Sequence, residues 1–129
     1  MDAAAITLSA IDIPYKATAA LCLRSGFLAF RRIANYFDIP NPQDPQYSND
    51  PISIQRDEFD SALNQLVSVG VPLKADREQA WKDFAGWRVN YDRALLVLCP
   101  LVMAPYAPWS SDRTPKLKLP PLFIFKKNL

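Results

Sequence analysis

The fold of this chain is decided by residues 77–99, REQAWKDFAGWRVNYDRALLVLC. Apolar side chains recur there every three or four positions, which is the period of an α-helix that buries one face. This stripe consists of Trp81, Phe84, Tyr91, Leu95 and Leu98. Asp76 has the spacing of an N-cap, and Pro100 ends or kinks the helix. We therefore predict a core-facing helix from Arg77 to about Cys99, with an aromatic binding platform as the alternative.

Arg88 is the exception within this stripe, with Trp87 beside it. A guanidinium among apolar side chains needs a carboxylate or an aromatic face if it is buried. Asp92 lies one helical turn away, and Asp60 is the best candidate from elsewhere in the chain. We predict that Arg88 is at least half buried and paired with one of these two carboxylates.

Two further helices are predicted upstream, from Tyr15 to Phe37 and from Arg56 to Val69. The first has Pro14 at its start, and the second ends at Gly70, a common helix stop. The apolar face expected for the first comprises Leu21, Leu28, Phe30, Ile33, Ala34 and Phe37. Prolines fill an exposed connection over 41–50 and recur after residue 99. The prediction is an all-α bundle of three main helices over residues 1–113, with a Pro-rich tail over 114–129.

Composition excludes several classes of site. The 129 residues include no histidine, so Ser-His-Asp and Cys-His catalysis and His-ligated metals are excluded. Three scattered glycines cannot form a phosphate-binding loop. We therefore expect no cofactor and no metal. The one catalytic alternative is a small hydrolase or transferase that uses Asp57, Asp60 and Arg88, with Ser110 nearby.

Two cysteines, Cys22 and Cys99, both lie in apolar runs, and we expect buried, reduced, unreactive thiols. So few cysteines, together with no recognisable leader after Met1, predict a cytoplasmic location.

The end of the chain is basic and rich in proline. The basic residues are Arg113, Lys116, Lys118, Lys126 and Lys127. They suit a solubilising flank or a contact with an anionic membrane surface. Nucleic acid is not expected, because aromatic side chains are not interleaved with these cations.

Upstream, residues 94–111 are uncharged, but their prolines argue against a membrane span. We expect Tyr106 and Trp109 to fix the segment 105–109 by packing, and residues 114–129 to be loosely held.

Several segments together show a resemblance to known proteins. They are SGFLAFRRIA at 25–34, GVPLK at 70–74, DREQAW at 76–81, WRVNYD at 87–92 and MAPYAPW at 103–109. This pattern resembles the soluble helical region of uncharacterised bacterial proteins, some of them labelled ion-channel or other integral-membrane proteins, and covers residues 16–113. The chain has no Gly-Tyr-Gly or Gly-Phe-Gly filter, so it cannot itself be a potassium pore. The resemblance implies a cytosolic portion or a free-standing relative of such proteins.

The function expected from these observations is a non-enzymatic interaction or assembly module. Its partner would be another protein or a second copy of the chain, with a membrane surface as a further option. The candidate contact residues are Trp87, Arg88, Tyr91, Tyr106 and Trp109. A pocket that joins Asp57, Asp60, Arg88 and Ser110 would favour catalysis, whereas an exposed apolar face would favour assembly.

Overall fold

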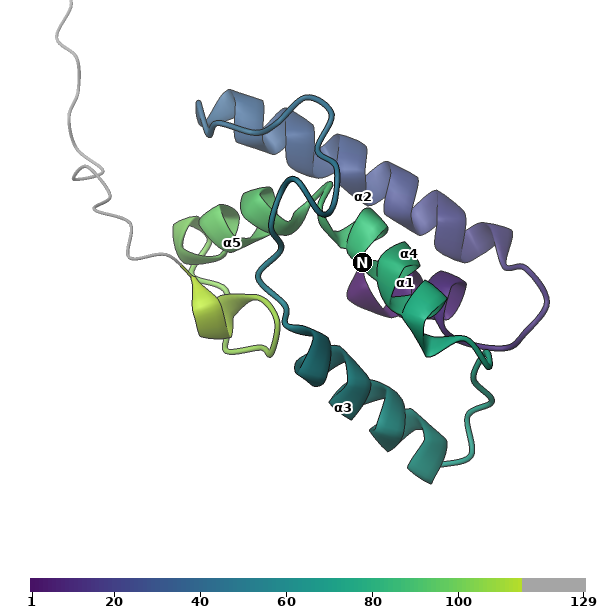
Figure 1. Cartoon of the computed structure of the whole chain (residues 1–129). Helices are drawn as coiled ribbons and strands as arrows, with labels where there is room; N and C mark the ends of the chain where they lie inside the picture. Colours follow the sequence, from purple (N-terminus) through teal and green to yellow (C-terminus); the bar gives the residue numbers. More distant parts are fainter. Residues whose placement is uncertain (115–129) are drawn as a thin grey trace, which may run out of the picture.

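The computed structural model describes residues 1–114 and shows an all-α fold (Figure 1). Five α-helices follow one another: α1 (Asp2–Ser9), α2 (Ala17–Tyr36), α3 (Arg56–Ser68), α4 (Arg77–Arg88) and α5 (Asp92–Leu101). A 3-10 turn, η1 (Ser111–Arg113), comes after them. No β-strand occurs within these 114 residues. The predicted fold class is confirmed, but the predicted number of three helices is wrong.

The helix that the sequence analysis missed, α1, is central to the packing. It contacts both α2 and α4, and its Ala5 and Ser9 are buried. The residues after it are tied to the segment before α4: Asp12 N–H donates to the Pro72 carbonyl at 2.9 Å, and Lys74 N–H donates to the Ala10 carbonyl at 2.8 Å. The chain start is therefore part of the core.

The long helix predicted over 77–99 is instead two helices, α4 and α5. The break falls at residues 89–91. There the side-chain amide of Asn90 donates to the Gly86 carbonyl at 2.8 Å, and so satisfies a backbone acceptor that the end of α4 leaves without a helical partner. Asp92 then begins α5, where a carboxylate is favoured by the free backbone N–H groups. Pro100 lies inside the last turn of α5, which ends one residue later.

The second helix, α2, was predicted within two residues of its actual bounds, but its inner face was predicted correctly only in part. Leu21, Leu28, Ile33 and Phe37 are exposed. Ala34 is buried and Phe30 packs partly against the core, as predicted, and Leu23, which was not on the predicted face, is buried as well. Apolar residues occur on both sides of this helix, so periodicity alone could not identify the inner face. Packing against α1 and α5 selects it.

The α3 bounds were predicted closely, and aromatic side chains join this helix to α4. Phe59 lies 4.8 Å from Phe84 and 5.4 Å from Trp81, measured between ring centroids. Gly70 follows α3 with a φ of +84°, which glycine adopts without strain. The connection over 41–50 is mostly exposed, as predicted, although Pro45 is buried.

The two cysteines differ, which corrects the expectation that both are buried. Cys99 is buried on α5, whereas Cys22 is exposed on the outer side of α2, and both are free thiols. Burial raises the pKa of Cys99, which further suppresses its thiolate. The apolar neighbours of Cys22 misled the sequence analysis because α2 carries apolar residues on both sides.

We predict that a thiol reagent modifies Cys22 rapidly in the folded protein and Cys99 only after denaturation. The measurement is the number of thiols modified over time, with and without denaturant. Cys22→Ser should remove the fast phase completely. Fast reaction of a second thiol without denaturant would contradict the burial of Cys99.

Candidate functional site

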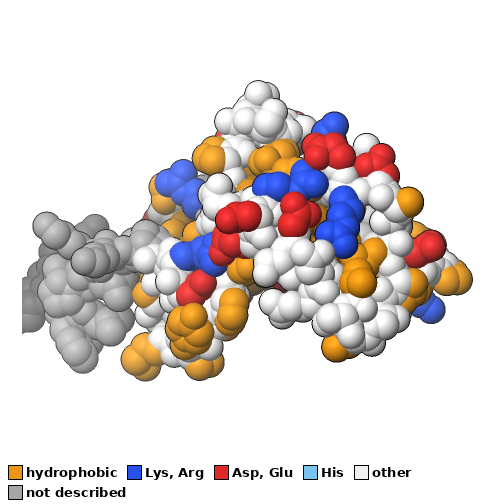
Figure 2. Space-filling model, turned by 60° about the horizontal axis from the view of Figure 1, so that its bottom comes forward, with side chains coloured by type: hydrophobic (Ala, Val, Ile, Leu, Met, Phe, Trp, Pro, Cys, Tyr) orange, Lys and Arg blue, Asp and Glu red, His pale blue; other side chains and the backbone are white. Residues whose placement is uncertain are grey.

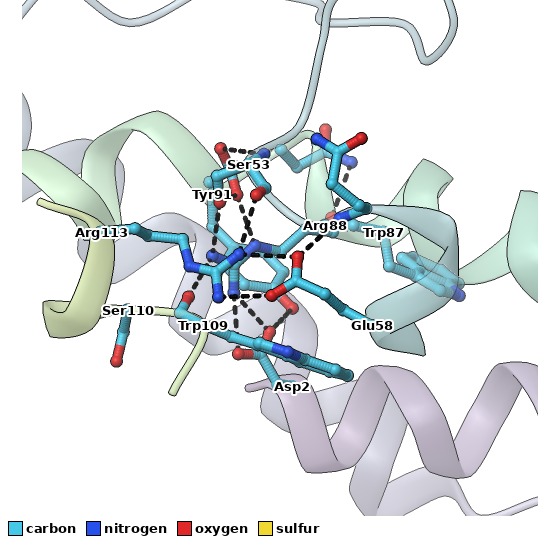
Figure 3. Close-up of polar contacts among 12 residues, drawn as sticks. Asp2, Ser53, Glu58, Trp87, Arg88, Tyr91, Trp109, Ser110 and Arg113 are labelled. Carbon is cyan, nitrogen blue, oxygen red and sulfur yellow. Dashed lines mark hydrogen bonds and ion pairs between the residues drawn. The ribbon is translucent and has the colours of Figure 1, made fainter. Parts of the chain in front are cut away.

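Arg88, the last residue of α4, lies at the centre of a buried polar cluster and has no exposed surface (Figure 3). Its Nη1 donates to both carboxylate oxygens of Asp2 on α1, each at 2.7 Å. Its Nε donates to Asp92 Oδ1 on α5 at 2.6 Å. These are charge-assisted bonds, and they join three helices through one side chain.

Other groups complete this Arg88 cluster. Arg88 Nη2 donates to the Trp109 carbonyl at 2.6 Å. The Ser53 hydroxyl donates to Asp92 Oδ1 at 2.6 Å, and the Tyr91 hydroxyl donates to Asp2 Oδ1 at 2.7 Å. Trp109 has a φ of +65°, an unfavourable conformation for a large side chain. The residue in this unfavourable backbone conformation is thus the one whose carbonyl accepts a hydrogen bond from Arg88.

Two groups of the cluster, Arg88 and Tyr91, have raised pKa values. Burial disfavours the charge on Arg88, but Asp2 and Asp92 outweigh it and raise the pKa of this guanidinium. Burial, together with the nearby Asp2 carboxylate, raises the pKa of Tyr91 far above its ordinary value, so its hydroxyl remains a hydrogen-bond donor. The cluster therefore acts as a structural junction, because the guanidinium is fully enclosed and bonded within the protein.

The prediction for Arg88 is confirmed for its burial and for Asp92, and it is wrong for Asp60. Asp60 instead pairs with Arg56 in the first turns of α3, at 2.9 Å. The sequence analysis missed Asp2, the strongest distant partner. The alanines after Asp2 favour a helix, but they give no information about which residue the carboxylate contacts.

Arg113, expected in the basic tail, belongs to the folded region. Its guanidinium donates to Glu58 Oε1 at 2.7 Å and to Asp112 Oδ2 at 2.8 Å. It also donates to the Ser53 carbonyl at 2.9 Å, beside the Arg88 cluster. Hydrogen bonding to Arg113 is the main cause of the lowered pKa values of Glu58 and Asp112. The same two hydrogen-bonded carboxylates raise the pKa of the Arg113 guanidinium. The other tail residues, Lys116, Lys118, Lys126 and Lys127, lie outside the described part of the chain.

Two of the predicted contact residues, Trp87 and Tyr91, line an open groove between α2 and α4. One end has a volume of about 340 Å³ and lies against Leu23 and Phe27 of α2. The other end, about 530 Å³, reaches Leu8 of α1. The two hollows share Ala20 and Trp87 and therefore lie next to each other, and we call them together the Trp87 groove.

The structure does not bring the remaining aromatic candidates to this groove. Trp109 packs on Phe84, with 5.6 Å between ring centroids, as the predicted anchoring requires. Tyr106 is 81% exposed, so it does not anchor its segment. The predicted mobility of the tail concerns residues that, apart from Thr114, the structure does not describe.

No family model matches the chain, and searches of curated proteins and of solved structures give no match. The resemblance to bacterial membrane-associated proteins remains a prediction. Within residues 1–114, no helix has the length and apolar character needed to cross a membrane. Function must therefore be inferred from the geometry alone.

We predict that Arg88→Met lowers the free energy of unfolding by about 3 kcal/mol, because it leaves Asp2 and Asp92 without their cation. Urea unfolding measures this change. Arg93→Met is the matched control, since Arg93 is exposed and forms no ion pair within residues 1–114. Equal stability of the two variants would show that the Arg88 cluster is not a structural junction.

The pairs of Arg113 predict a specific acid sensitivity. A carboxylate whose pKa is lowered by folding stabilises the protein fully above its ordinary pKa, and this contribution is lost as the pH falls through the folded-state value. Wild type should therefore lose more stability than Arg113→Gln between roughly pH 5 and pH 3. Lys82→Gln, which removes an exposed cation, should follow wild type. Parallel stability–pH curves for wild type and Arg113→Gln would contradict the prediction.

Proposed function

We propose that this protein is a non-enzymatic interaction module that holds an apolar segment of a partner protein in the Trp87 groove. The observation that carries the proposal is the 43% exposure of Trp87 within an apolar depression. A large aromatic side chain that remains partly exposed beside a groove is typical of an anchor for binding.

The arrangement of helices explains why the groove is present. Both α2 and α4 pack on α1, so they are held apart rather than packed closely on each other. The ring of Tyr91 lines the groove between them, and its hydroxyl is fixed by Asp2. The groove is therefore built beside the Arg88 cluster and is formed without a partner, which limits the entropy lost on binding.

The charges at the groove favour a partner segment that carries a carboxylate. Arg24 lines one end, and Lys82 lines the other together with Asp83. Arg24 and Lys82 form no ion pair with any residue in the range 1–114. An apolar segment with an acidic residue near Arg24 would complement this rim.

The catalytic alternative has less support from the geometry. Arg88 is enclosed by Asp2 and Asp92, and Asp60 pairs with Arg56. Asp57 is exposed near the start of α3, where its carboxylate accepts the Glu58 N–H at 3.0 Å. A hydrolase or transferase of this kind would need Asp57, Asp60 and Arg88 to meet at a shared pocket. None of the three lines either end of the Trp87 groove.

The test places a photo-crosslinking phenylalanine analogue at position 87 and, as the control, at position 106, an exposed aromatic position outside the groove. Position 87 should give a discrete cross-linked product in the native host, and position 106 should not. A product with twice the mass of the chain would identify self-association. The absence of a discrete product at position 87, or equal products at both positions, would contradict the proposal.

A second measurement tests whether the contact depends on Trp87. The cross-linked segment, made as a synthetic peptide, should bind Trp87→Ala at least tenfold more weakly than wild type, because a buried aromatic anchor commonly contributes about 2 kcal/mol. Tyr106→Ala should bind like wild type. Equal affinity for all three proteins would mean that the groove is not the binding site.

A further inference from the structure

A second surface comprises the outer side of α2 and the start of that helix. It shares Arg24 and Tyr15 with the rim of the Trp87 groove, and the charges on α2 all have one sign. Residues 13–37 contain no Asp or Glu, but they contain Lys16, Arg24, Arg31 and Arg32. Arg31 holds the following connection, with its Nη2 donating to the Pro42 and Gln43 carbonyls. Lys16 and Arg32 are exposed and form no ion pair within the described 114 residues.

The face that includes α3 shows a different pattern, with acidic and basic side chains interspersed (Figure 2). Arg56 pairs there with Asp60 and Glu78, and Arg113 pairs with Glu58 and Asp112. Cations on that face are neutralised by their neighbours. The cations of α2 lack such neighbours on their own helix, so they leave a positive surface that attracts an anionic partner.

The same side of α2 exposes apolar side chains. Leu21 is 63% exposed, Leu28 is 44% exposed and Ile33 is 42% exposed. Aromatic residues are exposed at both ends of the helix, with Tyr15 before it and Tyr36 in its last turn. Figure 1 shows α2 along one edge of the molecule, where this side is not covered by another helix.

We infer that this outer face of α2 docks on a membrane surface that contains anionic lipids. The leucines and Ile33 would enter the boundary between headgroups and acyl chains, while Lys16 and Arg32 would contact lipid phosphates. Tyr36, exposed in the last turn of α2, suits the headgroup region, where an amphipathic ring is favoured, whereas Tyr15 also lines the Trp87 groove. The helix would lie in the plane of the surface rather than cross it.

A lipid surface fits these observations better than another macromolecule does. The cations and apolar side chains are mixed over one protruding helix, not gathered in a pocket that a protein side chain could fill. A second copy of the chain would bring a surface of the same positive charge to the contact, and the nearest carboxylates in the sequence, Asp12 and Asp38, lie beyond the two ends of the segment. Mobile anionic headgroups can adjust to each cation separately.

The test is co-sedimentation of the full chain with vesicles of neutral phosphatidylcholine, and with vesicles that also contain phosphatidylglycerol. Binding should require phosphatidylglycerol and should fall in high salt. Lys16→Gln/Arg32→Gln should weaken it by roughly 5-fold for each cation removed. Leu21→Ser/Leu28→Ser should also weaken it, because it removes apolar contact without changing the charge. Arg24 is left unchanged, since it lines the Trp87 groove.

The basic tail needs its own control because it also carries lysines. Lys126→Gln/Lys127→Gln removes the same charge as the α2 variant and should weaken binding less. A polarity-sensitive dye on Cys22 should shift to shorter wavelength with phosphatidylglycerol vesicles, which locates the contact on α2. Circular dichroism verifies that the variants are folded.

Three results would overturn the inference. The first is no binding to anionic vesicles, and the second is binding that the tail variant abolishes and both α2 variants leave unchanged. The third is a dimer in solution that the α2 variants dissociate. None of these results would affect the test of the Trp87 groove, because the substituted α2 residues lie outside it.

Discussion

The rest of the structure depends on the burial of one guanidinium. A fully enclosed arginine is strongly destabilising unless charged and polar partners surround it. Arg88 obtains these partners from five parts of the chain. Asp2 on α1 and Asp92 on α5 supply carboxylates, and the ring of Tyr91 lies against the guanidinium. The Ser53 hydroxyl, before α3, and the Trp109 carbonyl, before η1, accept its remaining bonds. This single side chain therefore links α1, α4 and α5 to the connection before α3 and to the loop before η1.

The same saturation of hydrogen bonds leaves Arg88 without a free donor for a ligand, whereas Trp87 beside it keeps exposed surface. Trp87 and Tyr91 flank Arg88 along the chain and line a groove, while the guanidinium lies beneath them. Of the two, Trp87 is 43% exposed and Tyr91 only 1%, so Trp87 supplies the accessible aromatic surface of the groove. Chemistry would need a reactive group that reaches the solvent.

The sequence predicts those features that depend on local spacing. The bounds of α2 and α3 follow from prolines, a glycine stop and acidic first turns, and the pair of Arg88 with Asp92 follows from their separation of four residues. Asp2 lies 86 residues from Arg88, and no local pattern connects them. The helix α1 was missed because eight residues rich in alanine carry almost no amphipathic signal. Without α1, the inner face of α2 could not be assigned, and Cys22 was placed on the wrong side.

The exposed side of α2 follows from this packing. A helix with apolar residues on both sides can bury only the side that meets other elements, and here α1 and α5 cover one side alone. Six of the 13 carboxylates, none of them on α2, are paired with Arg56, Arg88 and Arg113. The chain therefore keeps no carboxylate on α2 with which to neutralise its outer cations. An apolar surface of uniform positive charge is stabilised by an anionic partner from outside the chain.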